Sequence, residues 1–354
     1  MTSAPHWIFL AEFLGGSVCS LTLLPGHHPC QTSVVCSHCQ IRGDHIVNLR
    51  LSRRHILRFI GSAALLGLAP SITFARKNPL QKLILSSGEK IPAIGMGTWQ
   101  TFNVGNDPQL RRQRTDVLKK FFEYGGGMVD CSPMYGSSAE MVGYALKQLG
   151  FPKTLFSAEK IWTWNGDATG QQVSEQAEAW SLERFDLIQV HNLTSWQDHL
   201  ANLEAMKQAG KIRYIGITTS HGRRHRELEK ILQTKDLDFV QLTYNLTHRE
   251  AEQRLLPLAR ERGIAVIANR PYDGGSLIKP LQRHEKVPAW AADELNCRTW
   301  ADYLLRFIVS HPSVTCAIPA TTQVAHMQEN MEAGRGPMPD ASQRQRMIND
   351  IRSL

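Results

Sequence analysis

Four polar side chains that could act together on a proton lie at the ends of short apolar runs. Asp130, Lys160 and His191 each end a separate run, and Tyr135 follows Asp130 by five residues. A phenol has an ordinary pKa of about 10, so it is neutral near pH 7 and can give up its proton if its surroundings tune it. Reduction of a carbonyl needs such a group, because a hydride goes to carbon and a proton to oxygen.

The three residues around this tyrosine have types that could support the transfer. A buried ammonium at Lys160 favours the phenolate and makes Tyr135 a stronger acid. Asp130 can pair with Lys160 and compensate its burial. His191 can donate a hydrogen bond to the carbonyl oxygen and orient the substrate. Singly, a strand-end aspartate is often a helix cap and a strand-end lysine is often solvated; the combination indicates a catalytic site.

The runs that carry these side chains belong to a regular alternation of strand and helix patterns. Amphipathic helical patterns, for example at 111–124, 139–149 and 195–209, lie between β-like runs. There are eight such runs, at 93–97, 128–130, 155–160, 186–191, 214–218, 239–243, 265–269 and 316–319. This alternation predicts an α/β fold, a (β/α)8 TIM barrel, in which strand ends meet at one catalytic face. Runs at 83–85 and 90–92 flank a turn at 86–89 and predict a short N-terminal hairpin that closes the barrel bottom.

Charge and cysteine content exclude other classes of protein. The chain of 354 residues has a net charge of +8, of which +5 lies in residues 1–78. The remaining balance is modest, so we expect no nucleic-acid partner. Four of the seven cysteines lie within the first 40 residues, which does not indicate a disulfide framework. Cys36 and Cys39 have the spacing of zinc ligands, but no second pair follows, so we expect no metal site.

Residues 49–76 have the pattern of a twin-arginine signal peptide. Arg53 and Arg54 precede an apolar run at 59–69, and a candidate cleavage site follows at 73–75. The run is shorter than the about 20 residues that span a bilayer, so we expect no stable membrane anchor. The pattern predicts the twin-arginine export machinery as a partner and a periplasmic location, or a cytoplasmic one if these residues have another role. Residues 1–48 are not assigned to a domain: they are either upstream sequence that a misplaced start codon adds to the protein or a disordered segment.

The region from 79 to 354 forms the predicted barrel, and most of it resembles the aldo/keto reductase family. The resemblance rests on the motifs IPAIGMGTW at 91–99, VDCSPMYG at 129–136, DLIQVHN at 186–192 and GKIRYIGI at 210–217. It implies an NADP(H)-dependent oxidoreductase that reduces aldehydes or ketones to alcohols. It also implies that Tyr135 is the general acid, assisted by Lys160, Asp130 and His191.

The resemblance implies cofactor-binding positions as well, although some have changed. Thr219 replaces the usual asparagine, Asn269 an aromatic ring, and Ala320 and His326 the lysine and arginine that grip the adenosine 2′-phosphate. These departures leave NAD(H) open beside NADP(H). The implied cofactor-binding residues are Gly97, Thr98, Thr218, Gln241, Arg270, Thr321, Glu329 and Asn330.

The substrate side of the predicted site is aromatic. Trp99, Trp162 and Asn192 follow strand ends and are assigned to a pocket for a small carbonyl compound. The alternative for the tryptophans is packing on the barrel rim. On the same fold, a nucleotide-binding sensor or regulatory partner is the second hypothesis. An exposed apolar patch on the outer helices would favour it, whereas the four polar residues favour catalysis by what we expect to be a monomer.

Overall fold

The computed structural model describes residues 8–13, 17–25, 32–36, 78–284 and 286–354. Two compact units are distinguished, residues 1–74 and 75–354. In the first, an antiparallel sheet joins β1 (Ile8–Phe13), β2 (Ser17–Pro25) and β3 (Thr32–Cys36). The predicted signal at 49–76 lies outside the described residues. Within the part that is described, no helix has the length and apolar character needed to cross a membrane.

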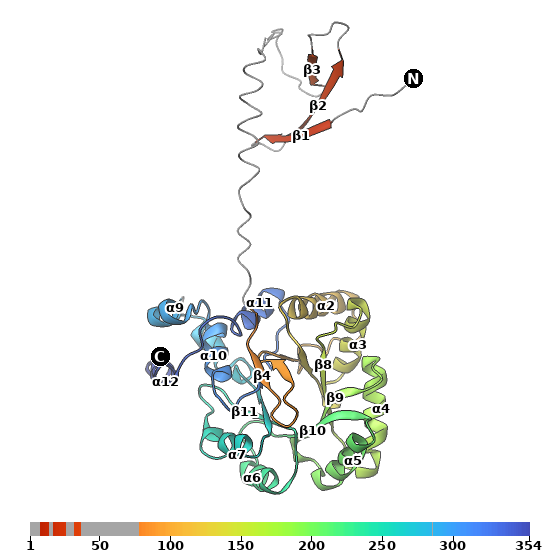
Figure 1. Ribbon diagram of the computed structural model, residues 1–354, viewed down its shortest axis with the longest axis vertical. Helices are drawn as coiled ribbons and strands as arrows, with labels where there is room; N and C mark the ends of the chain where they lie inside the picture. Colours follow the sequence, from red (N-terminus) through yellow and green to blue (C-terminus); the bar gives the residue numbers. More distant parts are fainter. Residues whose placement is uncertain (1–7, 14–16, 26–31, 37–77, 285) are drawn as a thin grey trace. The chain divides into compact units, whose positions relative to one another are not determined.

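The second unit is a barrel of eight parallel strands, which confirms the predicted (β/α)8 fold (Figure 1). Gly95 N–H donates to Ala317 O and Gly97 N–H to Pro319 O, while Ala317 N–H donates to Ala93 O. These bonds close the ring between its first and last strands. In order, the strands are β6 (Met96–Gly97), β7 (Met128–Asp130), β8 (Phe156–Ile161), β9 (Phe185–Val190), β10 (Ile212–Thr218), β11 (Phe239–Thr243), β12 (Ala265–Asn269) and β13 (Cys316–Ala317).

Helices surround the strands and bury their apolar faces against them (Figure 1). The first shows why they form where they do: Asp107 accepts from two backbone N–H groups, and Pro108 occupies the first turn. The helices are α2 (Pro108–Glu123), α3 (Ser138–Leu149), α4 (Thr169–Trp180), α5 (Trp196–Gln208), α6 (His225–Thr234), α7 (Leu255–Glu261), α8 (Ile278–Leu281), α9 (Ala289–Leu295), α10 (Trp300–Val309), α11 (Val324–Glu332) and α12 (Ala341–Ser353).

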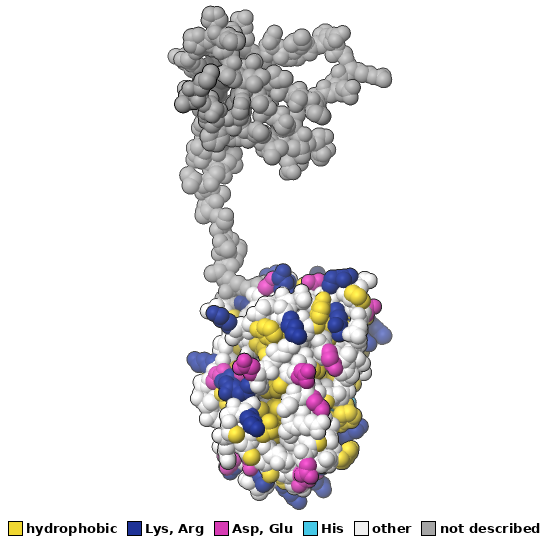
Figure 2. Space-filling view, turned by 90° about the vertical axis from the view of Figure 1, so that its right-hand side faces the viewer, with side chains coloured by type: hydrophobic (Ala, Val, Ile, Leu, Met, Phe, Trp, Pro, Cys, Tyr) yellow, Lys and Arg dark blue, Asp and Glu magenta, His cyan; other side chains and the backbone are white. Residues whose placement is uncertain are grey.

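A hairpin of β4 (Gln81–Leu83) and β5 (Lys90–Pro92) closes the N-terminal end of the barrel, as predicted. Ile84 and Ile91 are buried in one cluster with Met128, Phe156 and other residues from inside the strands. On the flank seen in Figure 2, Lys and Arg side chains are interspersed with Asp and Glu. The closed bottom leaves the C-terminal strand ends as the accessible end of the barrel.

Strand register brings the predicted polar residues to this end. Asp130 on β7 is level with Gly97 on β6 and with Ala158 on β8. Lys160 on β8 is level with Gln189 on β9, and Thr218 on β10 with Gln241 on β11. Two single turns of 3₁₀ helix, Pro133–Tyr135 and His191–Leu193, follow β7 and β9. The side chains can therefore converge although they lie far apart in sequence.

Candidate active site

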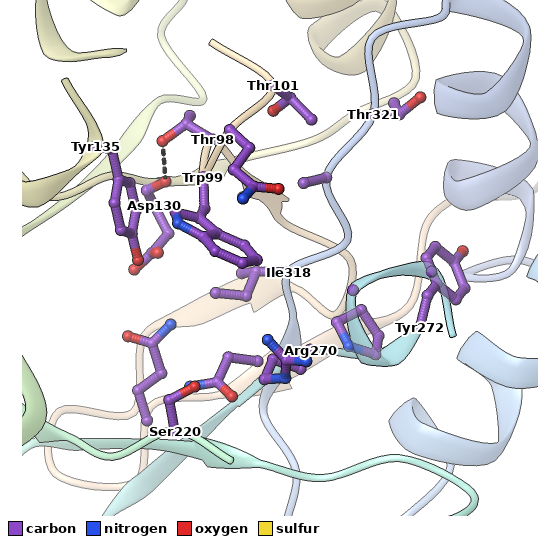
Figure 3. A pocket seen from close by; sticks show the side chains of 18 of the residues that line it. Thr98, Trp99, Thr101, Asp130, Tyr135, Ser220, Arg270, Tyr272, Ile318 and Thr321 are labelled. Atoms are coloured by element: carbon purple, nitrogen blue, oxygen red, sulfur yellow. Dashed lines mark hydrogen bonds between the residues drawn. The ribbon is translucent and has the colours of Figure 1, made fainter. Parts of the chain in front are cut away.

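A cavity of about 650 Å³ opens among the C-terminal strand ends. Figure 3 shows Trp99, Tyr135 and Arg270 around it, with Tyr272 and Thr321 farther along. It is lined by all the predicted site residues except one: Gly97, Thr98, Trp99, Asp130, Tyr135, Lys160, His191, Asn192, Thr218, Gln241, Arg270, Thr321, Glu329 and Asn330.

The exception is Trp162, which does not line this cavity, so its assignment to the substrate pocket stays a prediction. The residue is 44% exposed and is not among the cavity-lining side chains. Gln172 on α4 holds its backbone, accepting from Trp162 N–H at 2.7 Å and donating to its carbonyl oxygen at 3.3 Å. These two bonds join the backbone after β8 to α4.

Asp130 and Lys160 form a buried ion pair beneath the cavity. Lys160 Nζ lies 2.7 Å from Asp130 Oδ2 and also donates to the carbonyl oxygen of Cys131 at 2.6 Å. The two side chains are 2% and 1% exposed. Burial lowers the pKa of Lys160, but the charges of Asp130, Tyr135 and Glu159 and the hydrogen bond to Asp130 together outweigh it and raise that pKa, so the ammonium is retained. Burial of both ions is tolerable because each has the other as a partner.

Tyr135 lies above this ion pair. Lys160 Nζ is 5.3 Å from the centre of the phenol ring, and the ring of His191 packs edge-on at 5.8 Å. Burial raises the pKa of Tyr135, while the positive charge of Lys160 acts in the opposite direction. The lysine thus has the effect expected from the sequence, but burial is stronger. The phenol keeps its proton and is available as a donor.

His191 is neutral in this setting. Burial and the nearby charge of Lys160 lower its pKa to about 3. Its Nδ1 lies 2.8 Å from Ser132 Oγ. The next residue, Asn192, has a left-handed backbone, and its N–H donates to Thr218 Oγ1 at 2.9 Å. This bond ties the turn after β9 to the end of β10 and fixes the position of the imidazole.

Farther along the cavity, several polar atoms fit a nicotinamide dinucleotide. Gln241 Oε1, Asn330 Nδ2 and Thr219 Oγ1 are buried and have no hydrogen-bond partner among the described residues. Such atoms are costly unless a ligand satisfies them. A Cβ atom at Gly97 would lie 2.9 Å from Ile318 O, so only glycine fits at this position without a clash with the backbone of Ile318. An acceptor, a donor and a hydroxyl along one cavity suit the carboxamide, adenine and hydroxyl groups of such a ligand.

Asn269, which departs from the family pattern, and the following Arg270 both contact other residues of the protein. Asn269 accepts from Thr243 Oγ1 at 2.8 Å and donates to Thr219 O at 2.9 Å, so its amide braces three strand ends. Arg270 pairs with Asp273 at 2.9 Å, and its guanidinium lies 6.0 Å from the ring centre of Trp99. Arg270 is thus a cation held at the cavity by a carboxylate and an aromatic ring.

Two buried residues beside the site were assigned no role from the sequence. Ser132 contacts His191, as described above. Glu159 points away from Lys160 into the helix layer: Oε2 accepts from Trp180 Nε1 at 3.0 Å and Oε1 from Lys160 N–H at 2.9 Å. Burial raises the pKa of Glu159 to about 8, with Lys160 opposing the rise. The sequence signal that could have identified Glu159 is a glutamate inside a strand that is buried on both faces.

Replacing Glu159 by glutamine is expected to stabilise the protein in a pH-dependent way. The folded-state pKa of about 8 lies above the ordinary 4.5, so the wild type loses stability as pH rises between these values. The free energy of unfolding of Glu159→Gln should exceed that of the wild type by about 1–3 kcal/mol at about pH 9, and by little at about pH 5. Urea unfolding at both pH values measures this. Exposed Glu140→Gln is the control, and a gain independent of pH would contradict the argument.

Comparison with known proteins agrees with this architecture. A closed α/β barrel whose cavity at the C-terminal strand ends carries convergent polar side chains is an enzyme scaffold. The aldo/keto reductase family matches residues 93–346, and the chain belongs to this family of oxidoreductases acting on carbonyl compounds.

Individual relatives are consistent with that assignment. The methylglyoxal reductase YeaE of Escherichia coli is 30% identical over 262 residues, which cover 71% of this chain and 88% of the relative. Among solved structures, an aldo/keto reductase from Klebsiella pneumoniae in complex with NADP and acetate has a TM-score of 0.64 at 22% identity, covering 77% of this chain and 95% of that one. An aldo-keto reductase from Bacillus halodurans in its holo form gives 0.65 at 20% identity, over 77% and 96%.

Proposed function

We propose that this protein reduces aldehydes or ketones to alcohols with NADP(H), and that Tyr135 is the general acid. The observation that carries the proposal is that four side chains in contact with one another, those of Asp130, Lys160, Tyr135 and His191, line one cavity. The Asp130–Lys160 ion pair lies beneath the phenol, and a neutral imidazole packs against its edge. Each residue then has one task in protonating a carbonyl oxygen.

Tyr135 donates its proton to the oxygen as negative charge develops there. Lys160 stabilises the phenolate that remains, and Asp130 keeps the ammonium in place. His191, being neutral, donates a hydrogen bond to the carbonyl oxygen rather than losing a proton to it. The reverse reaction uses the same groups, with the phenolate as base.

A bound nicotinamide supplies or accepts the hydride. Gln241 and Asn330, with their orphaned polar atoms, are assigned to its carboxamide and adenine ends, and Arg270 to a phosphate. The neighbouring Klebsiella structure is of a complex with NADP, which supports NADP(H). A 29% identical relative from Escherichia coli is named an NADH-specific methylglyoxal reductase, so NAD(H) is the alternative cofactor.

The test of this function is oxidation of NADPH and of NADH by the purified full chain, followed at 340 nm. Because two relatives are methylglyoxal reductases, methylglyoxal heads a panel of aliphatic and aromatic aldehydes and ketones. Turnover of any carbonyl with either nucleotide supports the proposal. Tight nucleotide binding without turnover of the panel would instead favour a nucleotide-binding sensor or partner.

The proposal extends to export of the enzyme through the twin-arginine signal at 49–76. The adjacent Arg53 and Arg54 ahead of an apolar run are the observation that supports it. In a bacterium with this pathway, the full chain should be recovered from the periplasm. The variant Arg53→Lys/Arg54→Lys should stay in the cytoplasm. Retention of both proteins in the cytoplasm would contradict the export proposal, and it would have no bearing on the proposed carbonyl reduction.

A further inference from the structure

Ser132 is a buried hydroxyl that contacts the imidazole of the site. Its side chain is 0% exposed, and Oγ lies 2.8 Å from His191 Nδ1. It follows Asp130 by two positions and caps the 3₁₀ turn that carries Tyr135. The same oxygen accepts a hydrogen bond from Met134 N–H at 3.3 Å. The serine therefore joins the turns after β7 and β9.

The direction of the contact between Ser132 and His191 follows from the number of donors. A hydroxyl has one proton to give, and a neutral imidazole carries one proton on one of its two nitrogens. If Nδ1–H donated to Oγ, the serine proton would need another acceptor. The described residues offer none, because the only other bond of Oγ is the one it accepts from Met134. That arrangement leaves a buried donor unpaired, which is unfavourable.

With the serine donating to Nδ1, neither the serine hydroxyl nor the Nδ1 atom of His191 is left without a partner. The imidazole then carries its proton on Nε2, the ring nitrogen to which the described residues give no hydrogen bond, and His191 lines the cavity. This tautomer can donate from Nε2 to a substrate oxygen, whereas the other would present a lone pair to that oxygen and repel it.

We propose that Ser132 is a positioning residue that holds His191 in the Nε2–H tautomer by donating a hydrogen bond to Nδ1. The proposal rests on the proposed function for the task of His191, which is to bind a carbonyl oxygen. It concerns the free protein as well, because Ser132 and His191 are in contact without any ligand. The serine acts on the substrate only through the imidazole.

The direct test is the tautomer of His191 in the full chain labelled with ¹⁵N-histidine, without substrate. The signal is assigned by its loss in His191→Asn. Near pH 7 we expect a protonated Nε2 and an unprotonated Nδ1 in the wild type. In Ser132→Ala we expect a mixture of the two tautomers. A wild-type imidazole protonated on Nδ1 would overturn the proposal. Because no turnover is involved, this outcome is distinct from failure of the proposed function.

Activity supplies the second readout. Ser132→Ala is expected to lower kcat/KM for carbonyl reduction by about 5- to 10-fold, the value of one neutral hydrogen bond, with the Kd of NADPH unchanged. Ser157→Ala is the matched control, since Ser157 is an equally buried serine whose hydroxyl donates to Asp186 on β9. An equal loss in both variants would indicate a merely structural role and overturn the proposal. Should Ser132→Ala fail to fold, the wild-type tautomer alone decides.

Discussion

Replacing Tyr135 by phenylalanine is expected to reduce kcat for carbonyl reduction by about 10²–10⁴-fold, the usual contribution of a general acid. The substitution removes only the hydroxyl, and the ring can keep its edge contact with His191 and its place above Lys160. Loss of activity would therefore report loss of the proton donor rather than collapse of the cavity. The measurement is steady-state NADPH oxidation with the best carbonyl of the panel.

Nucleotide binding separates this explanation from a folding defect. The orphaned atoms of Gln241 and Asn330, to which we assign the nucleotide, are untouched by the substitution. Fluorescence titration should thus give a Kd for NADPH close to that of the wild type. Tyr144→Phe is the control, because Tyr144 is a half-buried tyrosine on α3 whose ring lies beside Arg111 rather than at the cavity. Full activity of Tyr135→Phe would remove the phenol from the mechanism.

Lys160→Met is expected to damage both activity and stability. Without the ammonium, Asp130 is left as a buried carboxylate 2% exposed, with the side-chain amides of Gln189, at 3.4 Å, and of Gln241 as remaining hydrogen-bond partners. Removing one partner of a buried pair costs about 3–5 kcal/mol. Kcat should fall with the loss of charge beside the phenol. Urea unfolding and NADPH oxidation measure the two effects separately.

The double variant Asp130→Asn/Lys160→Met distinguishes the two roles. It removes both charges, so it should regain most of the stability lost in Lys160→Met. It should regain none of the activity, because the phenolate still lacks a cation. Recovery of activity together with stability would mean that Lys160 serves only to hold the fold.

Much of the fold could be predicted because the strands are buried runs of regular spacing. The runs at 128–130, 239–243 and 265–269 agree with the structure to the residue. The run at 316–319 is shorter as a strand, since Pro319 has no N–H to give to a neighbour. The helix expected from residue 111 begins at Pro108, because the cap at Asp107 precedes the apolar pattern.

The site was less predictable, because its contacts depend on which strand ends meet. Trp162 has the right residue type and sequence position for the pocket, yet it does not line the cavity, and its backbone N–H donates to Gln172 on α4. The importance of Ser132 depends on a contact with His191, 59 residues away, which the motif itself does not reveal. Glu159 and Lys160 are consecutive in β8, so their side chains point to opposite faces of the sheet. Only the hydrogen bond from Trp180 shows where the carboxyl group of Glu159 lies.

The closure of the barrel also has a consequence for ligand binding. The ring is joined between its two shortest strands, β6 and β13, each of two residues. Gly97 and Thr98 lie on one side of this joint, and Thr321 and Asn330 on the other, all lining the same cavity. A nucleotide that touches both sides binds only the closed ring, so by mass action it opposes local unfolding there. We therefore expect bound cofactor to hold the joint between β6 and β13 closed, so that the nucleotide concentration determines how often the barrel opens there.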